Sequence, residues 1–224
     1  SLRGRSFYLE LFIEHIIDEI LEALNLSRVN LIYSAGSQFY MLLPNVPKTI
    51  EILENYKKIV NDFLLKELGT SVYYEISHTE TSAEELGNGL SKDIKDENKI
   101  GELFKKTSAK VSKEKLNRYS LDQLRELLDE NSSINEVKSY TRECNICKKS
   151  EDEKILRRNA KDFDEESEVE LCSSCKSYID LGKDISKLYH SSNENFIVEE
   201  NCEENQNGLI FPKYSEAYVN VIIK

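Results

Sequence analysis

The sequence lacks several features that identify common protein classes. It has no tryptophan, one methionine, three prolines and three histidines among 224 residues. No apolar run approaches the roughly 20 residues of a membrane span, and residues 1–7 lack the apolar region and cleavage site of a signal peptide. His15, His78 and His190 have no partner at the spacing of a metal or nucleophile site, and no Walker-type phosphate loop occurs. We therefore expect a soluble, cytoplasmic protein with no membrane partner.

The charge balance sets a second limit on function. The chain carries 41 acidic and 30 basic side chains, giving a formal net charge of −11 at pH 7. Proteins that bind nucleic acid without regard to sequence gain most of their affinity by neutralising phosphates with Lys and Arg. The acidic balance argues against a free-standing protein of that class, although a local basic patch remains open.

Apolar spacing predicts two helices near the start of the chain. Residues 7–24 and 50–68 repeat apolar side chains at steps of three and four, as the buried face of an amphipathic helix does. Gly69 follows the second segment, where glycine commonly ends a helix. His15 falls on the first helix and is interpreted as a packed or solvated residue.

Strand-forming residues surround these helices. Residues 30–33 and 39–43 flank a short run of small residues, which predicts a hairpin, and residues 71–76 (SVYYEI) predict a further strand. The order helix, strand, strand, helix, strand is that of a ferredoxin-like βαββαβ unit without its first strand. Because that strand lies inside the sheet, its absence leaves two strands without a shared neighbour. We therefore expect an α+β domain whose natural start lies before residue 1.

The rest of the chain is predicted to be helical, then metal-binding, then β-stranded. A polar connector over 79–98 leads to helical spacing at 100–115 and 121–128, and Ser120 and Gln123 form a capping box for the second of these helices. The expected organisation has four parts: the ferredoxin-like domain at 1–80, the connector and helices at 81–140, a four-cysteine module with a helix at 141–190, and a β-strand tail at 191–224.

Four of the five cysteines form two Cys-x-x-Cys pairs, Cys144 with Cys147 and Cys172 with Cys175. Two intervening residues allow both sulfurs of a pair to face one ion, and four thiolates suit tetrahedral Zn²⁺. Since four protein ligands leave no position for water, we expect the zinc to be structural. Reduced core cysteines and a redox dithiol are the alternatives, and Cys202 is interpreted as a small core residue.

Arg3 and Arg5 precede the first predicted helix with Gly4 between them. The amino terminus of a helix attracts anions, so the two arginines are a candidate anion-binding site. A solvated basic turn explains them equally well.

Two runs carry a family resemblance, LRGRSFYLELF at 2–12 and YSAGSQFYMLLP at 33–44. With the paired cysteines, they resemble the first palm domain and zinc-bearing segment of the large subunit of type III-A, Csm-type CRISPR-Cas effector complexes, over residues 1–189. The resemblance implies an antiviral subunit whose histidine-aspartate domain cuts single-stranded DNA. It also implies a second palm whose Gly-Gly-Asp-Asp motif makes cyclic oligoadenylates from ATP with Mg²⁺ or Mn²⁺. Neither motif occurs here, so we expect an internal, noncatalytic fragment.

The resemblance also implies partners and a nucleotide site. The partners are the other Csm-complex subunits, especially the one that holds the 5′ end of the guide RNA, together with guide RNA, target RNA and ATP. Other palms carry metal-binding carboxylates at the hairpin tip, whereas this chain has only uncharged residues there. Their backbone and hydroxyl groups are implied to contact ATP, at Ser34, Ala35, Gly36 and Ser37. An ordinary hairpin turn is the alternative.

Two other functions stay open on the sequence alone. A free-standing RNA-recognition-like domain with a zinc ribbon would bind single strands through exposed aromatic residues, for which Tyr33, Phe39, Tyr73 and Tyr74 are candidates. An independent cyclase of the diguanylate type would need carboxylates near Ser37.

Overall fold

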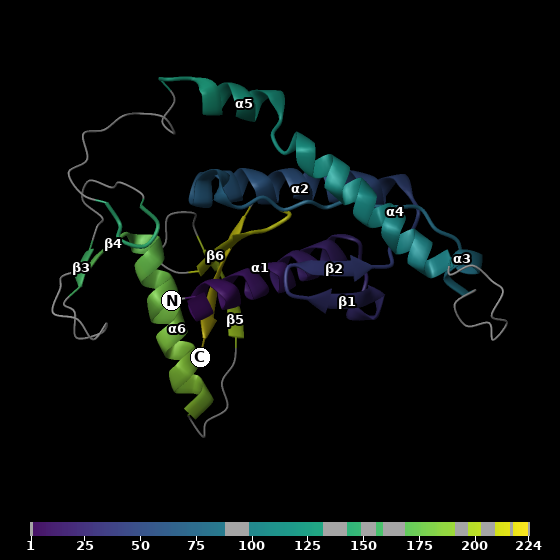
Figure 1. Cartoon of the computed structure of the whole chain (residues 1–224). Coiled ribbons are helices and arrows are strands. Elements are labelled where there is room, and N and C mark those ends of the chain that lie inside the picture. Colours follow the sequence, from purple (N-terminus) through teal and green to yellow (C-terminus); the bar gives the residue numbers. More distant parts are fainter. Residues whose placement is uncertain are drawn as a thin grey trace. The chain divides into compact units, whose positions relative to one another are not determined.

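The structure is a computed structural model, and it describes residues 2–87, 99–131, 143–148, 156–158, 169–190, 197–202, 209–215 and 217–223. Figure 1 labels the main helices and strands along the chain. The chain divides into two compact units. Unit 1 comprises Ser1–Ile16, Leu128–Phe211 and Ala217–Lys224, and unit 2 comprises Ile17–Leu127 and Pro212–Glu216. The four-part division expected from the sequence stays a prediction.

Two long helices occupy the positions that apolar spacing predicts. Helix α1 spans Leu2–Ala23, and α2 spans Pro47–Leu68. Proline suits the first turn of α2 because the amide hydrogen that it lacks would have no partner there. Gly69 adopts φ 62 and donates its backbone N–H to the Leu65 carbonyl, which ends the helix. In unit 2, α2 buries Ile52, Leu53, Tyr56, Val60, Phe63 and Leu64.

The predicted hairpin is confirmed. Strands β1 (Leu31–Ala35) and β2 (Gln38–Met41) pair antiparallel, with Ala35 opposite Gln38. At the open end, the Asn30 carbonyl accepts the Leu42 N–H at 2.8 Å, and the Asn30 side-chain amide donates to the Leu42 carbonyl at 2.8 Å. Backbone and side chain of one residue therefore close the pair.

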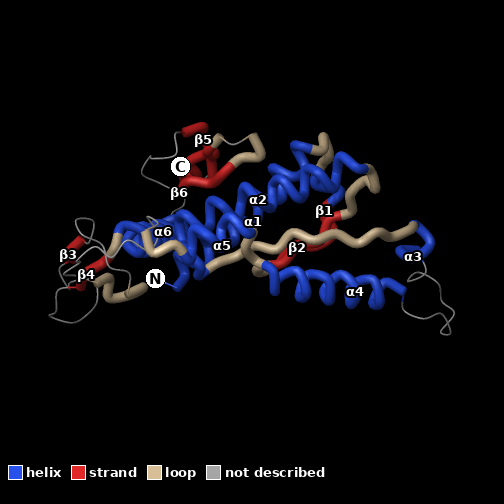
Figure 2. Tube along the Cα trace, turned by 90° about the horizontal axis from the view of Figure 1, so that it is seen from above, coloured by secondary structure: helices blue, strands red, loops and turns tan. Residues whose placement is uncertain are grey.

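The strand predicted over residues 71–76 does not form in this chain. A short 3-10 helix covers Gly69–Ser71, and residues 72–80 have no regular secondary structure. The Asn61 side chain accepts the Tyr74 N–H at 2.9 Å and donates to the Tyr74 carbonyl at 2.8 Å. An amide of α2 thus takes the place of a neighbouring strand at Tyr74. Figure 2 shows this segment running back along α2, between α2 and α4.

In the described part of unit 2, α2 is followed by α3 (Ala83–Gly87), α4 (Lys99–Glu114) and α5 (Leu121–Leu128), whose last residue belongs to unit 1. The predicted capping box is confirmed, because Ser120 Oγ accepts the Gln123 N–H at 3.2 Å and Gln123 Oε1 accepts the Ser120 N–H at 2.9 Å. Part of the polar connector, at 88–98, lies outside the described residues. Among the helices that the structure describes, none has the length and apolar character needed to cross a membrane.

Unit 1 includes α1 as far as Ile16, helix α6 (Ser173–His190) and a three-stranded sheet in the order β5-β7-β6. The predicted tail strands are confirmed as β5 (Ile197–Cys202), β6 (Leu209–Pro212) and β7 (Tyr218–Ile223). Phe211 is fully buried, with its ring 5.4 Å from Tyr8 and 5.1 Å from Phe12. Aromatic pairs at such separations add to the stability gained from burial. With its small antiparallel sheets, the chain belongs to the expected mixed helix and sheet class.

Candidate metal centre and hairpin turn

The first cysteine pair lies in a tight turn beside a short β ladder. Strands β3 (Leu156–Arg158) and β4 (Val169–Leu171) pair antiparallel, and the Glu170 carbonyl accepts the Asn145 N–H at 2.9 Å. The Cys144 carbonyl then accepts the Lys148 N–H at 2.9 Å, which closes the turn. Lys148 adopts φ 61, a left-handed conformation that favours glycine. The turn brings Cys144 and Cys147 to one side.

The second cysteine pair begins helix α6. Cys172 directly precedes the helix, and Cys175 lies in its first turn. The Cys175 N–H points to the Cys172 sulfur at 3.4 Å, so this sulfur accepts one of the amide hydrogens that a helix start leaves without a partner. The positive end of the helix dipole also favours a thiolate at this position.

The two pairs meet in one cluster. The sulfurs of Cys144, Cys147, Cys172 and Cys175 all lie within 4.8 Å of one another. Cys147 Sγ and Cys172 Sγ are 3.6 Å apart, far beyond a disulfide bond, and all four cysteines are free. Tetrahedral coordination with Zn–S bonds of about 2.3 Å would place the sulfurs about 3.8 Å apart. The four cysteines can therefore hold a metal ion with little rearrangement.

Burial affects how readily the four thiols of the cluster ionise. Cys144, Cys172 and Cys175 are buried together with Leu171 and Ile179, whereas Cys147 is exposed. Burial raises the pKa of the Cys144 thiol, but backbone N–H groups of Cys147, Cys172 and Ile146 donate to its sulfur and lower the pKa to about 6. Burial raises the pKa values of Cys172 and Cys175. Four adjacent thiols cannot all ionise without a cation to balance them.

Helix α1 crosses α6 next to this cluster. A Cβ atom at Gly4 would overlap the carbonyl oxygen of Tyr178 and lie 3.1 Å from the backbone nitrogen of Gly182. Arg5 Nη2 donates to Cys175 Sγ at 3.2 Å, and Arg3 Nη1 donates to Ser186 Oγ at 2.7 Å. Both arginines thus contact α6, on either side of the crossing. The expectation that Arg3 and Arg5 precede the first helix is wrong, because α1 begins at Leu2 and includes both arginines. The anion site suggested for them stays a prediction.

The hairpin turn is exposed throughout. Ser34, Ala35, Gly36 and Ser37 are all exposed, and a Cβ at Gly36 would find nothing within 4 Å. Gly36 has φ 62 and Ser37 does not adopt a positive φ, as expected for a type II′ hairpin turn with glycine first. The turn residues are accessible to a ligand, and none supplies a carboxylate.

The aromatic residues that an RNA-recognition-like surface would use mostly contact one another. Phe39 stacks on Tyr74 at 6.2 Å, and Tyr40 meets Phe104 edge-on at 4.9 Å. Tyr33 is half-exposed and lies 6.2 Å from Tyr40. Rings that pack within the chain are less available to nucleic-acid bases, so the geometry does not favour this alternative.

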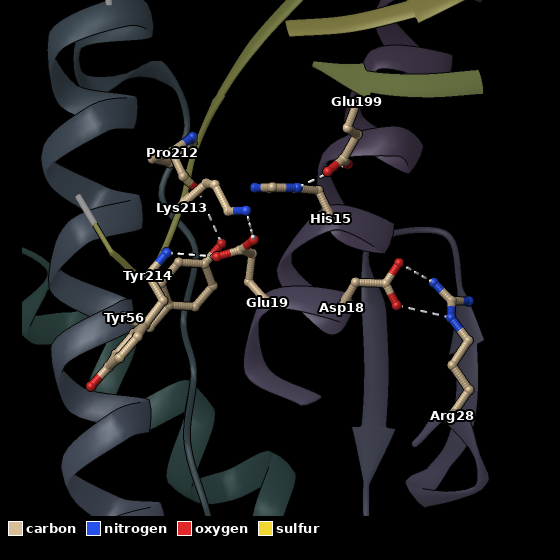
Figure 3. Close-up of polar contacts among 9 residues, drawn as sticks. All are labelled: His15, Asp18, Glu19, Arg28, Tyr56, Glu199, Pro212, Lys213 and Tyr214. Atoms are coloured by element: carbon tan, nitrogen blue, oxygen red, sulfur yellow. Dashed lines mark hydrogen bonds and ion pairs between the residues drawn. The ribbon is translucent and has the colours of Figure 1, made fainter. Parts of the chain in front are cut away.

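Figure 3 shows two buried polar residues on α1, His15 and Glu19. The sequence indicated His15 without a partner and did not indicate Glu19. In unit 1, His15 is buried, and its Nδ1 lies 3.0 Å from Glu199 Oε1. In unit 2, the buried Glu19 accepts the Tyr214 N–H at 2.7 Å and lies 3.7 Å from Lys213 Nζ. Their four-residue spacing on an apolar face is the available signal, but it does not reveal partners so distant in sequence. No His190 side-chain position is described.

A family model described as Csm1 subunit domain B matches residues 1–132. The chain belongs to the Csm1 family. The Cas10/Csm1 single-strand-specific deoxyribonuclease (subtype III-A) of Mycobacterium tuberculosis is 37% identical over 150 residues, covering 65% of this chain and 18% of the relative. The corresponding Enterococcus italicus protein is 31% identical over 185 residues, covering 83% of this chain and 21% of the relative.

Solved Csm1 structures have the same fold. A crystal structure of a Csm1–Csm4 subcomplex in the type III-A CRISPR-Csm interference complex aligns with all of this chain, and the match covers 23% of the solved chain. The TM-score is 0.57 and the sequence identity is 19%. The crystal structure of a Csm1–Csm4 cassette in complex with cA3 has a TM-score of 0.56 and 20% sequence identity. This match covers 100% of this chain and 22% of the solved chain. The chain spans 18% and 21% of the two curated relatives. The expected membership of the type III-A large-subunit family is confirmed.

Proposed function

We propose that this chain is the noncatalytic first palm and zinc module of a type III-A CRISPR large subunit that acts in antiviral defence in the cytoplasm. The proposal is supported by the match of residues 1–132 to Csm1 subunit domain B and by the four-cysteine cluster that follows. In the whole subunit, other domains cleave single-stranded DNA and make cyclic oligoadenylates. This chain contributes a scaffold and part of the ATP pocket.

Zn²⁺ is the ion that best suits the cluster. Thiolate ligands select Zn²⁺ over Mg²⁺ and Ca²⁺, and a complete set of four makes a closed, structural site. Bound zinc supplies a cross-link between the Cys144 turn and the start of α6. The ligands are proposed to be Cys144, Cys147, Cys172 and Cys175.

Metal analysis with a matched cysteine control tests this site. The purified chain is expected to contain one zinc per molecule by plasma mass spectrometry. Cys144→Ser removes one of the four sulfurs and should leave zinc substoichiometric, because the remaining site is incomplete. Cys202→Ser replaces the cysteine on β5 and should retain the full amount. Equal zinc content in the two variants would refute the assignment, as would a wild-type chain without zinc.

We also propose that segment 72–76 becomes a sheet strand in the complete palm. Val72 is extended at φ −132 and ψ 136, and β-branched and aromatic residues at 72–74 favour a strand. A preceding strand of the full subunit would pair with this segment and complete a ferredoxin-like sheet. Amide exchange at Tyr73 and Glu75 should slow when that preceding segment is restored, and unchanged exchange would contradict the pairing.

The hairpin turn is proposed to contact ATP through its backbone and hydroxyl groups. Its exposure and small side chains support this role. No turn residue offers an anionic ligand, so the turn does not suit Mg²⁺ or Mn²⁺. We propose that those ions bind in the second palm. In the full subunit, Ser37→Trp should raise the KM for ATP several-fold, while Thr70→Trp, at another exposed turn, should not. Equal KM values would exclude contact at this turn.

The proposed partners are the other subunits of the Csm complex, including the one at the 5′ end of the guide RNA. The solved Csm1–Csm4 assemblies with the same fold support this proposal. Guide RNA and target RNA are reached through the complex. Copurification of the full subunit with Csm4 from a coexpression strain tests the pairing, and separate elution would count against it.

A further inference from the structure

A tetrathiolate zinc site carries a net negative charge, and the guanidinium of Arg5 lies beside one of the four sulfurs. Four thiolates around Zn²⁺ leave a charge of −2, and burying such a charge is costly unless hydrogen bonds or cations compensate it. We propose that Arg5 is a positioning residue of the metal centre: it compensates the thiolate charge at Cys175 and couples metal binding to the seating of α1 on α6. This inference rests on the proposed zinc site.

The side chain of Arg5 is held from two directions. Its Nη2 lies 3.2 Å from Cys175 Sγ, and its Cζ lies 5.9 Å from the centre of the Tyr178 ring. The Tyr178 ring in turn meets Tyr8 edge-on at 5.1 Å. A guanidinium can donate hydrogen bonds and stack on a ring at the same time. The contact with the sulfur is therefore fixed by packing as well as by charge.

The helix crossing at Gly4 explains why an arginine of α1 reaches the cluster. Gly4 allows the α1 backbone to touch the α6 backbone at Tyr178 and Gly182. Arg5 follows Gly4 and turns toward the cysteine end of α6, whereas Arg3 precedes it and contacts Ser186, farther along α6. The two arginines have the same charge, lie on the same helix and contact the same neighbour. Only Arg5 of this pair contacts a metal-ligand candidate.

The chemistry of the contact favours the metal-bound state. A guanidinium carries only donors, so it interacts more strongly with a thiolate than with a thiol. Zinc keeps the sulfur as a thiolate, and the arginine then lowers the cost of the extra negative charge. Hydrogen-bonding partners of metal ligands typically change metal affinity by about 10- to 100-fold when they are removed. With zinc bound, the anion that Arg5 contacts would thus be the protein's own sulfur.

Coupling follows because binding effects are reciprocal. If the Arg5 contact strengthens metal binding, metal binding must strengthen the docking of α1 by the same free energy. Removal of zinc should therefore loosen the first turns of α1 as well as the cysteine turns. Helix α2 contributes no residue to the cluster and provides the internal reference for this effect.

Zinc competition with a matched arginine control tests the proposal. Zinc affinity is measured on the full 224-residue chain by competition with a chromogenic chelator. Arg5→Gln should weaken affinity by about 10- to 100-fold. Arg3→Gln loses the same charge and should change affinity by no more than about twofold, as surface substitutions do. Equal affinities of the two variants would overturn the proposal. A wild-type chain that binds no zinc would instead refute the proposed function.

Two further measurements separate charge compensation from a general loss of folding. Arg5→Lys keeps the charge, so its affinity should lie between those of wild type and Arg5→Gln; affinity as low as that of Arg5→Gln would exclude a role for the charge. In wild type, zinc removal should speed amide hydrogen exchange at residues 5–9 of α1 and leave residues 52–64 of α2 unchanged. Unchanged exchange at residues 5–9 would overturn the coupling.

Discussion

Replacing Gly4 by alanine tests the helix crossing most directly, because two physical effects act with opposite sign. Alanine has the higher helix propensity, which would stabilise α1 by about 1 kcal/mol. The added methyl group, however, would overlap the Tyr178 carbonyl and approach the Gly182 backbone nitrogen to 3.1 Å. Both obstacles are backbone atoms, which cannot move away by changing a rotamer. The helices must separate instead.

The cost of this separation exceeds the gain in propensity. Overpacking of a close contact costs about 1–3 kcal/mol. Separation also stretches the hydrogen bonds from Arg5 to Cys175 and from Arg3 to Ser186, each worth about 1 kcal/mol. After the gain from alanine is subtracted, we expect a net loss of about 3 kcal/mol. For a chain of this size, that loss lowers the melting temperature by roughly 6–12 °C.

Thermal unfolding of the zinc-loaded chain, followed by circular dichroism at 222 nm, measures this loss. The control is Ser6→Ala, because Ser6 is exposed on the same helix and gains propensity without meeting a neighbour. Its melting temperature should stay the same or rise slightly. A melting temperature of Gly4→Ala at or above that of wild type would show that helix propensity prevails, and the close crossing would be refuted.

Three other perturbations have defined outcomes. Asn61→Leu leaves the Tyr74 N–H and carbonyl without their side-chain partner and should lower the free energy of unfolding in urea by about 2–4 kcal/mol. Asn55→Leu, at an exposed site of α2, should lower it by less than about 0.5 kcal/mol. Similar losses in the two variants would contradict the role of Asn61. Lys148→Gly should raise the melting temperature, because glycine relieves a left-handed strain of about 1 kcal/mol; a decrease would count against it. Burial raises the pKa of Tyr74, so the contribution of its neutral side chain to stability is complete below about pH 10 and falls at higher pH. In Tyr74→Phe, the midpoint of urea unfolding should fall less steeply above that pH than in wild type. Identical pH profiles of the two proteins would contradict this prediction.

The features that the sequence predicts correctly depend on local patterns. Apolar spacing over 7–24 and 50–68 was sufficient for α1 and α2, because a helix satisfies its own backbone hydrogen bonds. The Ser120 and Gln123 capping box was predictable for the same reason, since its partners lie three residues apart. Small residues at 34–38 between strand formers were enough for the hairpin.

The features that were missed depend on contacts between distant parts of the chain. Residues 71–76 have strand-forming side chains, but a strand also needs a neighbour, and Asn61 supplies the partner groups at Tyr74 instead. Gly4 was interpreted only as part of an arginine-rich turn, because the residues next to it in sequence do not indicate a contact with Tyr178. Cysteine spacing correctly predicted a compact cluster, whereas the approach of Arg5 to Cys175 could not be found from spacing.

The crossing of α1 and α6 also has a consequence for the order in which the chain folds. Arg5 and Cys175 are 170 positions apart in sequence, so their contact must close a long loop. At roughly 5–20 residues per second, a ribosome needs about 10–30 seconds to synthesise the intervening chain. Phe211, the ring partner of Tyr8 and Phe12 from the carboxyl-terminal sheet, is synthesised later still. The segment of unit 1 that is synthesised first is therefore among the last to reach its native packing.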